Sequence, residues 1–154
     1  MRVHLAILEQ KYLRRILDGS KTIEYRGNKI GCAPHGRVAA GDLVFLKQSG
    51  GPVRGLARVQ WVEARINPTH TELRELVSRH ARGLGFSGPP RWPVSHVSLI
   101  ALHDIQAVHP PFRVKQPGRS AWLVLDEGQY WEDLGIELPA GPTPPPEFLA
   151  RLRA

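Results

Sequence analysis

The 154-residue chain is 42% hydrophobic and 23% charged, which are ordinary values for a folded domain, so wholesale disorder is not expected. Its 21 Lys and Arg residues against 14 Asp and Glu residues give a net charge of +7, which favours polyanionic partners, although a charge kept for solubility would look the same. One cysteine excludes an internal disulfide, and no apolar run is long enough for a signal peptide or a membrane span, so we expect a cytoplasmic protein.

A strand, a helix and a second strand are predicted in the first 26 residues. The apolar run 4–8 (HLAIL) indicates a buried strand, and residues 9–17 then shift to helical spacing, which Gly19 ends as a C′ residue. Residues 21–26 alternate like a strand, with Ile23 on one face. The opposite face carries Thr22, Glu24 and Arg26.

A hairpin is predicted next. Residues 27–40 are rich in Gly, Pro and Asn and predict a loop, after which residues 43–47 (LVFLK) form an apolar strand. The segment 48–52 (QSGGP) predicts a tight connection into a long strand over 53–63. Gly55 inside that strand indicates a β-bulge or a close backbone approach.

A second helix and further strands complete the predicted domain. Thr69 is the expected N-cap of a helix that ends near residue 81, and residues 83–93 are expected to form a turn-rich loop. One or two strands are predicted over 97–108, with an interruption at Pro110-Pro111. A final core strand is predicted over 121–125 (AWLVL).

The order of these elements predicts the fold class. About six strands with two or three helices, without regular strand–helix alternation, predict an α+β fold, a β-pseudo-barrel rather than a doubly wound parallel sheet. We expect this domain to occupy residues 1–137. The segment 138–154 is too rich in proline for a core and is expected to be a semi-rigid tail that contains a short helix.

The polar face of the strand over 21–26 is the first candidate site. Residues two apart on a strand lie about 6.5–7 Å apart, so Glu24 and Arg26 can share a ligand or pair with each other. Arg26 is suited to clamp a phosphate, and Glu24 to accept from a base amino group. Strict alternation places Lys21 on the Ile23 face, but its long side chain can curl round the strand end. Burial would lower the pKa of Lys21 while Glu24 would raise it, and a surface Glu–Arg pair of little energy is an equal alternative for this pattern.

Four ordered segments resemble the ASCH family of PUA-like domains and together span roughly residues 3–126. These segments are ILDGSKTIEYR (16–26), GDLVFL (41–46), PVRGLARV (52–59) and GRSAW (118–122). The resemblance implies a PUA-like β-pseudo-barrel with a cleft lined by the first segment, and a role in RNA or modified-nucleoside recognition. Some family members resemble hydrolases of acetylated cytidine, and others are described as ribonucleases.

Carried over residue by residue, the resemblance matches Lys21 to the family's catalytic lysine. The deacetylating branch has its catalytic threonine where this chain has Glu24, and Thr22 matches a different threonine of the motif. The downstream glutamate of that branch has three candidates here. These are Glu63, Glu72 and Glu75. The departure at Glu24 favours binding over amidohydrolase catalysis.

Four further residues are predicted to bind the ligand. Lys47 and Ser49 flank the end of a strand at a Gly-Gly turn, and Arg119 lies in the last of the four family-like segments. Trp92, in the turn-rich loop, is suited to stack on a base. No cofactor is expected, and no metal, because Cys32 and His35 lack a second pair of ligands.

The predicted function is binding of RNA or of a modified nucleotide in a basic cleft, with Thr22 and Arg26 among the ligand-binding residues. The alternative is a hydrolase acting on RNA, as a ribonuclease, or on an acylated nucleoside such as N4-acetylcytidine, with Lys21 and Glu24 as tentative catalytic residues. A protein-interaction domain that docks a partner through its proline-rich tail is a third alternative.

Overall fold

The computed structural model describes residues 1–86, 88, 90–114 and 119–125. Within them the elements follow in the order β1 (Val3–Leu8), α1 (Gln10–Leu17), β2 (Ile23–Asn28), β3 (Leu43–Gln48), β4 (Val53–Ile66), α2 (His70–Arg79), α3 (Ala81–Leu84), β5 (His96–Phe112) and β6 (Trp122–Val124). The strand predicted over 21–26 begins two residues later, at Ile23. The predicted tail over 138–154 and the boundary at residue 137 lie outside the described residues.

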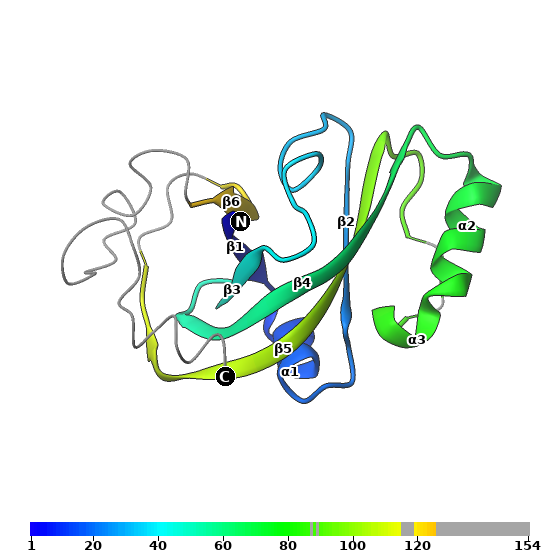
Figure 1. Ribbon diagram of the computed structural model, residues 1–154. Coiled ribbons are helices and arrows are strands. Elements are labelled where there is room, and N and C mark those ends of the chain that lie inside the picture. The colour runs from blue at the N-terminus through cyan, green and yellow to red at the C-terminus, as the bar shows by residue number, and fades with distance from the viewer. Residues whose placement is uncertain (87, 89, 115–118, 126–154) are drawn as a thin grey trace.

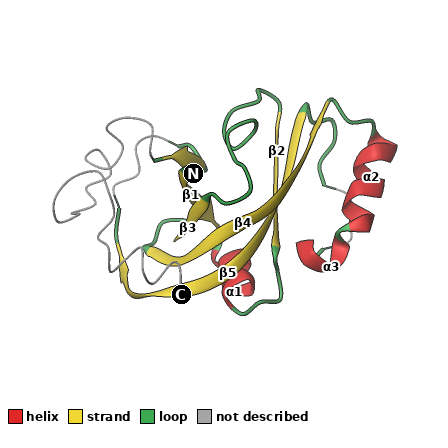
Figure 2. Ribbon diagram, in the orientation of Figure 1, coloured by secondary structure: helices red, strands yellow, loops and turns green. Residues whose placement is uncertain are grey.

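The strands form one curled six-stranded sheet in the order β2-β5-β4-β3-β1-β6 (Figures 1 and 2). β1 and β3 run parallel, which requires a long connection between them, and α1 and β2 form part of that connection. The other neighbouring strands are antiparallel. The predicted α+β pseudo-barrel is therefore confirmed as a six-stranded half-barrel with three helices among the described residues.

The two faces of β5 carry different helices. Ile100 packs in the hydrophobic cluster that includes Leu13 and Ile16 of α1. Its neighbour Leu99 packs in the cluster formed with α2 and α3. Because successive side chains of a strand point to opposite faces, α1 lies on one side of the sheet at β5, and α2 with α3 on the other. Glu24 of β2 is the direct partner of Ile100, so it shares the face covered by α1.

The helix ends follow the signals in the sequence. Gly19 has a φ of 84°, as expected for a C′ residue, and its amide donates to the Ile16 carbonyl at 3.1 Å. The Thr69 hydroxyl accepts from the Glu72 amide at 3.1 Å and so caps α2. No helix in the described ranges is long and apolar enough to cross a lipid bilayer.

Gly55 marks both a β-bulge and a close approach. The pairing register of β4 against β5 shifts between Val53 and Gly55. A Cβ atom at Gly55 would lie 2.7 Å from Cδ2 of Leu17, so a larger residue at this position would require the Leu17 side chain to move. The predicted β-bulge at Gly55 is confirmed, and the close contact is made by the Leu17 side chain, which packs α1 against the β3–β4 hairpin.

Two predictions for the segment after α2 are wrong. Residues 83–84 belong to α3 rather than to a loop, and β5 continues through Pro110-Pro111 to Phe112. Val53 pairs with Phe112 but Gly55 pairs with Ala107, so five steps along β5 face two steps along β4. The prolines lie in this excess segment of β5, where the ladder does not require an N–H donor from them.

Candidate functional site

The side chains of Lys21, Glu24 and Arg26 lie together on the α1 side of the sheet, and we call them the signature cluster. Lys21 precedes β2, and its side chain turns toward Glu24, with Nζ 3.8 Å from Oε1. Arg26 Nη2 donates to Glu24 Oε2 at 3.1 Å. Glu24 thus lies between two cations, all three side chains are largely buried, and the cluster keeps a net positive charge.

Lys21 is enclosed by the chain. Its residue is 1% exposed, and its ammonium donates to the carbonyl of Ile23 at 2.7 Å and to that of Leu84 at 2.9 Å. The Leu84 carbonyl is the last of α3 and has no partner within that helix. A cation is stabilised at this end of a helix because the unpaired carbonyls carry partial negative charge. The rings of Tyr12 and Phe86 lie 5.8 and 5.6 Å from Nζ and complete the enclosure.

Burial decides the direction in which the Lys21 pKa moves. Removal from water lowers the pKa below the ordinary 10.5, and the Glu24 carboxylate offsets only part of that effect. The nearby cations of Arg15 and Arg26 lower the pKa further. The two opposing effects expected from the sequence are therefore both present, and desolvation is the larger.

Arg26 joins the two edges of the curled sheet. It belongs to β2, one edge strand, yet its guanidinium donates to the carbonyls of Ile7 in β1 and Ala121 beside β6, the other edge, at 3.0 and 3.1 Å. The guanidinium carbon also lies 5.2 Å from the ring centre of Trp122. These contacts fix Arg26 while its side chain stays 16% exposed.

A buried series of hydrogen bonds that begins at Trp122 was not predicted from the sequence. Trp122 Nε1 donates to His4 Nδ1 at 3.0 Å, so His4 carries its proton on Nε2 and donates it to Asp42 Oδ2 at 2.9 Å. His4 is 0% exposed. In the sequence, His4 is one residue of an apolar strand, and its two partners lie 38 and 118 residues away.

Asp42 is expected to make the protein sensitive to acid. Burial alone would raise the pKa of Asp42, but hydrogen bonds from the Arg2 amide, the His4 ring and the Ala39 amide outweigh it and lower the pKa below 3.8. The stabilisation is therefore complete above about pH 4 and is lost as the pH falls through the lowered pKa. Asp42→Asn should reduce the free energy of unfolding at pH 7 by about 1–3 kcal/mol and flatten its acid dependence between pH 5 and 2, measured by urea denaturation. An unchanged acid slope would contradict this role.

His35 and Ser98 form a second buried polar pair. His35 Nδ1 lies 2.8 Å from Ser98 Oγ, and Ser98 is the direct strand partner of Arg26. Burial, together with the nearby ring of His96, lowers the His35 pKa. Among the described residues, His35 Nε2 has no hydrogen-bond partner. No group of three or more His, Cys, Asp or Glu residues there could hold a metal ion.

The other predicted ligand-binding residues belong to different parts of the fold. Thr22 is exposed at the start of β2, where its amide donates to Gly83. Lys47 is buried and donates to the Gln48 carbonyl, whereas Ser49 and Arg119 are exposed. The remaining one, Trp92, is half exposed and packs at the start of α2, with Nε1 donating to the Pro68 carbonyl and the ring against His70.

The three glutamates considered for the downstream position all belong to β4 or α2. Glu63 accepts from Arg79 and His80 at 3.4 and 3.2 Å. Glu72 and Glu75 are exposed on α2. Since α2 packs on the opposite face of β5 from α1, these two carboxylates are not on the face that carries Glu24.

The fold of this chain matches crystal structures of ASCH from Zymomonas mobilis. The unsubstituted protein matches with a TM-score of 0.62 at 17% identity, covering 81% of this chain and 88% of that one. Its tyrosine-to-phenylalanine variant matches with a TM-score of 0.63 at 17% identity, covering 82% of this chain and 92% of that one. Its serine-to-alanine variant matches with a TM-score of 0.61 at 17% identity, covering 81% of this chain and 89% of that one. No family model matches the sequence. The likeness confirms the predicted ASCH, PUA-like fold.

Proposed function

We propose that this chain, which has the fold of an ASCH domain, binds RNA or a nucleotide-like ligand beside Arg26. The observation that carries the proposal is the fixed, partly exposed guanidinium at the junction of the two sheet edges. Three of its five N–H donors make hydrogen bonds to residues in the described ranges. The other two can donate to a bound anion.

A phosphate suits this position because a guanidinium that is already held in place can donate a charge-assisted hydrogen bond to it with little loss of freedom. The signature cluster adds a net positive charge in a largely buried environment, where electrostatic attraction is stronger than in water. The chain charge of +7 attracts polyanions over longer distances. Glu24, held between Lys21 and Arg26, serves in this proposal to orient the arginine.

The test is binding of a fluorescent single-stranded RNA oligonucleotide, followed by anisotropy over a salt series. The unchanged protein should show an affinity that falls steeply with salt. Arg26→Lys keeps the charge but loses the fixed guanidinium and its free N–H donors, and we expect it to weaken binding about tenfold. Arg74→Lys, at an exposed arginine of α2, is the matched control because it also keeps the charge. Equal affinity of Arg26→Lys and the unchanged protein, both shown to be folded, would refute the site.

One observation favours hydrolysis as a second candidate function, namely the lowered pKa of buried Lys21, which is the change a general base requires. The test is incubation of the purified protein with single-stranded RNA and with N4-acetylcytidine, with and without divalent metal. Turnover that disappears in a folded Lys21→Arg variant supports a hydrolase. No product from either substrate under both metal conditions removes this candidate.

The proposed organisation has one folded domain over residues 1–137 and a tail over 138–154 whose composition suits docking to a partner protein. A cytoplasmic location is proposed from the single cysteine. Removal of the tail residues after Pro139 should leave thermal stability and RNA affinity unchanged if the tail serves only to bind a partner protein. A lower melting temperature would instead show that the tail is part of the domain.

A further inference from the structure

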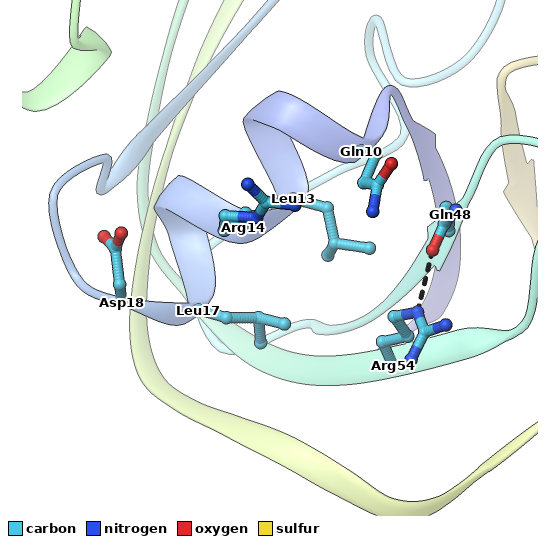
Figure 3. Close-up of a pocket in the computed structure, with 7 residues that line it drawn as sticks. All are labelled: Gln10, Leu13, Arg14, Leu17, Asp18, Gln48 and Arg54. Carbon is cyan, nitrogen blue, oxygen red and sulfur yellow. Dashed lines mark hydrogen bonds between the residues drawn. The ribbon is translucent and has the colours of Figure 1, made fainter.

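A pocket of about 490 Å³ lies between α1 and the β3–β4 hairpin (Figure 3). Its lining residues are Gln10, Leu13, Arg14, Leu17, Asp18, Gln48 and Arg54. The volume falls in the range of sites that bind small organic ligands. None of these residues belongs to the signature cluster, and the proposed function does not use them.

The pocket combines an apolar floor with polar walls. Figure 3 shows Leu13 and Leu17 side by side at its centre, the Gln10 amide above them, and Gln48 with Arg54 along the opposite wall. The floor is held in place because Gly55 lets Leu17 pack directly on β4. A flat or apolar part of a ligand can lie on the leucines, and the two amides offer both donors and acceptors to its edges.

The Arg54 side chain is held in position for binding. Its Nε donates to Gln48 Oε1 at 2.8 Å, which leaves its four Nη–H donors without a hydrogen-bond partner among the described residues. Gln48 itself folds over Gly51, where a Cβ atom would lie 3.0 Å from the Gln48 side chain. The tight glycine turn thus makes room for the glutamine that orients the arginine.

The charge of the pocket favours an anion. Arg14 extends from α1 and Arg54 from β4, and neither forms a salt bridge with a carboxylate in the described part of the chain. Asp18 is the acidic residue of the lining. Its Oδ1 accepts from the Ser20 amide at 2.8 Å, and Figure 3 shows its carboxylate directed away from the leucine floor.

We propose that this pocket binds an organic phosphate of the nucleotide type, free or as part of a strand. The phosphate is bound by the guanidinium group of Arg54, and the base or sugar lies on Leu13 and Leu17. Residues 10, 14 and 17 lie on a different flank of α1 from Tyr12, which faces Lys21. The pocket is therefore a second site, separated from the signature cluster by the helix, and it stands independently of the proposed function.

The test is a two-dimensional NMR titration of the full chain with uridine monophosphate. We expect saturable shifts of the side-chain amide signals of Gln10 and Gln48 and of the Arg54 Nε–H signal. Uridine without phosphate should bind at least about tenfold more weakly, because the charge-assisted hydrogen bonds are then absent. Arg54→Ala should weaken the nucleotide about tenfold, whereas the control Arg74→Ala should leave it unchanged. No shift at the two glutamine amides, or equal affinity in Arg54→Ala, would overturn the proposal.

Two further arms separate the ligand sources and the two sites. A uridine oligonucleotide that binds this pocket more tightly than the monophosphate identifies a strand as the ligand, and the reverse order identifies a free nucleotide. The glutamine shifts should persist in Arg26→Lys. If they do and RNA affinity is also unaffected by Arg26→Lys, the proposed function fails while the pocket stands. If the nucleotide shifts signals around Arg26 but not the glutamines, the pocket fails alone.

Discussion

Replacement of Lys21 by methionine is expected to lower the free energy of unfolding by about 3–5 kcal/mol, the usual cost of removing one partner from a buried charged pair. Methionine has a similar volume but no donor. The carbonyls of Ile23 and Leu84 lose their hydrogen bonds, and Glu24 loses one of its two neighbouring cations. The loss is large because no water can reach the 1%-exposed site to replace the ammonium.

Urea denaturation at pH 7 measures this effect. Lys11→Met is the matched control, because Lys11 is exposed on α1 and pairs only loosely with Glu9, at 3.6 Å. The control is expected to change the free energy of unfolding by less than about 0.5 kcal/mol. If Lys21→Met and Lys11→Met unfold at the same urea concentration, the ammonium does not contribute to stability, and a role in chemistry alone becomes the better account of its position.

The pairing of Glu24 with Arg26 is predictable because it depends on local geometry. Alternation along one strand places both side chains on the same face, and the 3.1 Å bond between them confirms the pairing. The turn of Lys21 toward Glu24 does not follow from local geometry alone. It depends on α3, whose last carbonyl lies 63 residues further along the chain and accepts a hydrogen bond from the Lys21 ammonium beside the first residues of β2.

The closure of the sheet by Arg26 cannot be predicted from the sequence. Its carbonyl partners belong to residues 19 and 95 positions away, and they come within reach only because six strands curl far enough to bring β2 beside β1 and β6. The course of β5 through Pro110-Pro111 has the same kind of cause. A bulge against β4 accommodates the prolines, and its place depends on the pairing of distant strands.

Arg26→Ala is expected to release the two edges of the half-barrel and to lower the free energy of unfolding by about 3–5 kcal/mol. The substitution leaves Glu24 without its closest cation and removes the donors to the carbonyls of Ile7 and Ala121. It also removes the cation above Trp122, which contributes about 0.5–2 kcal/mol in a partly buried contact. Arg26→Lys should recover part of the loss, because a lysine can pair with Glu24 but cannot reach both carbonyls at once.

Amide hydrogen exchange distinguishes this local opening from general destabilisation. The Ile7 amide donates to Ala121 and the Leu125 amide to Val3, so both report on the joined edge. In Arg26→Ala their exchange should accelerate more than that of Leu76 in α2, which packs on the opposite face of the sheet. Equal acceleration at all three amides would show that Arg26 contributes only to overall stability.

The same amides connect the closure of the sheet to ligand binding. Two N–H groups of Arg26 hold the edges and a third donates to Glu24. The other two have no partner within the described ranges, so a phosphate can bind Arg26 without opening the sheet. A ligand that binds only the closed form stabilises it in proportion to the logarithm of its concentration over the dissociation constant. Single-stranded RNA should therefore slow exchange at Ile7 and Leu125 in the unchanged protein and have no such effect in Arg26→Ala.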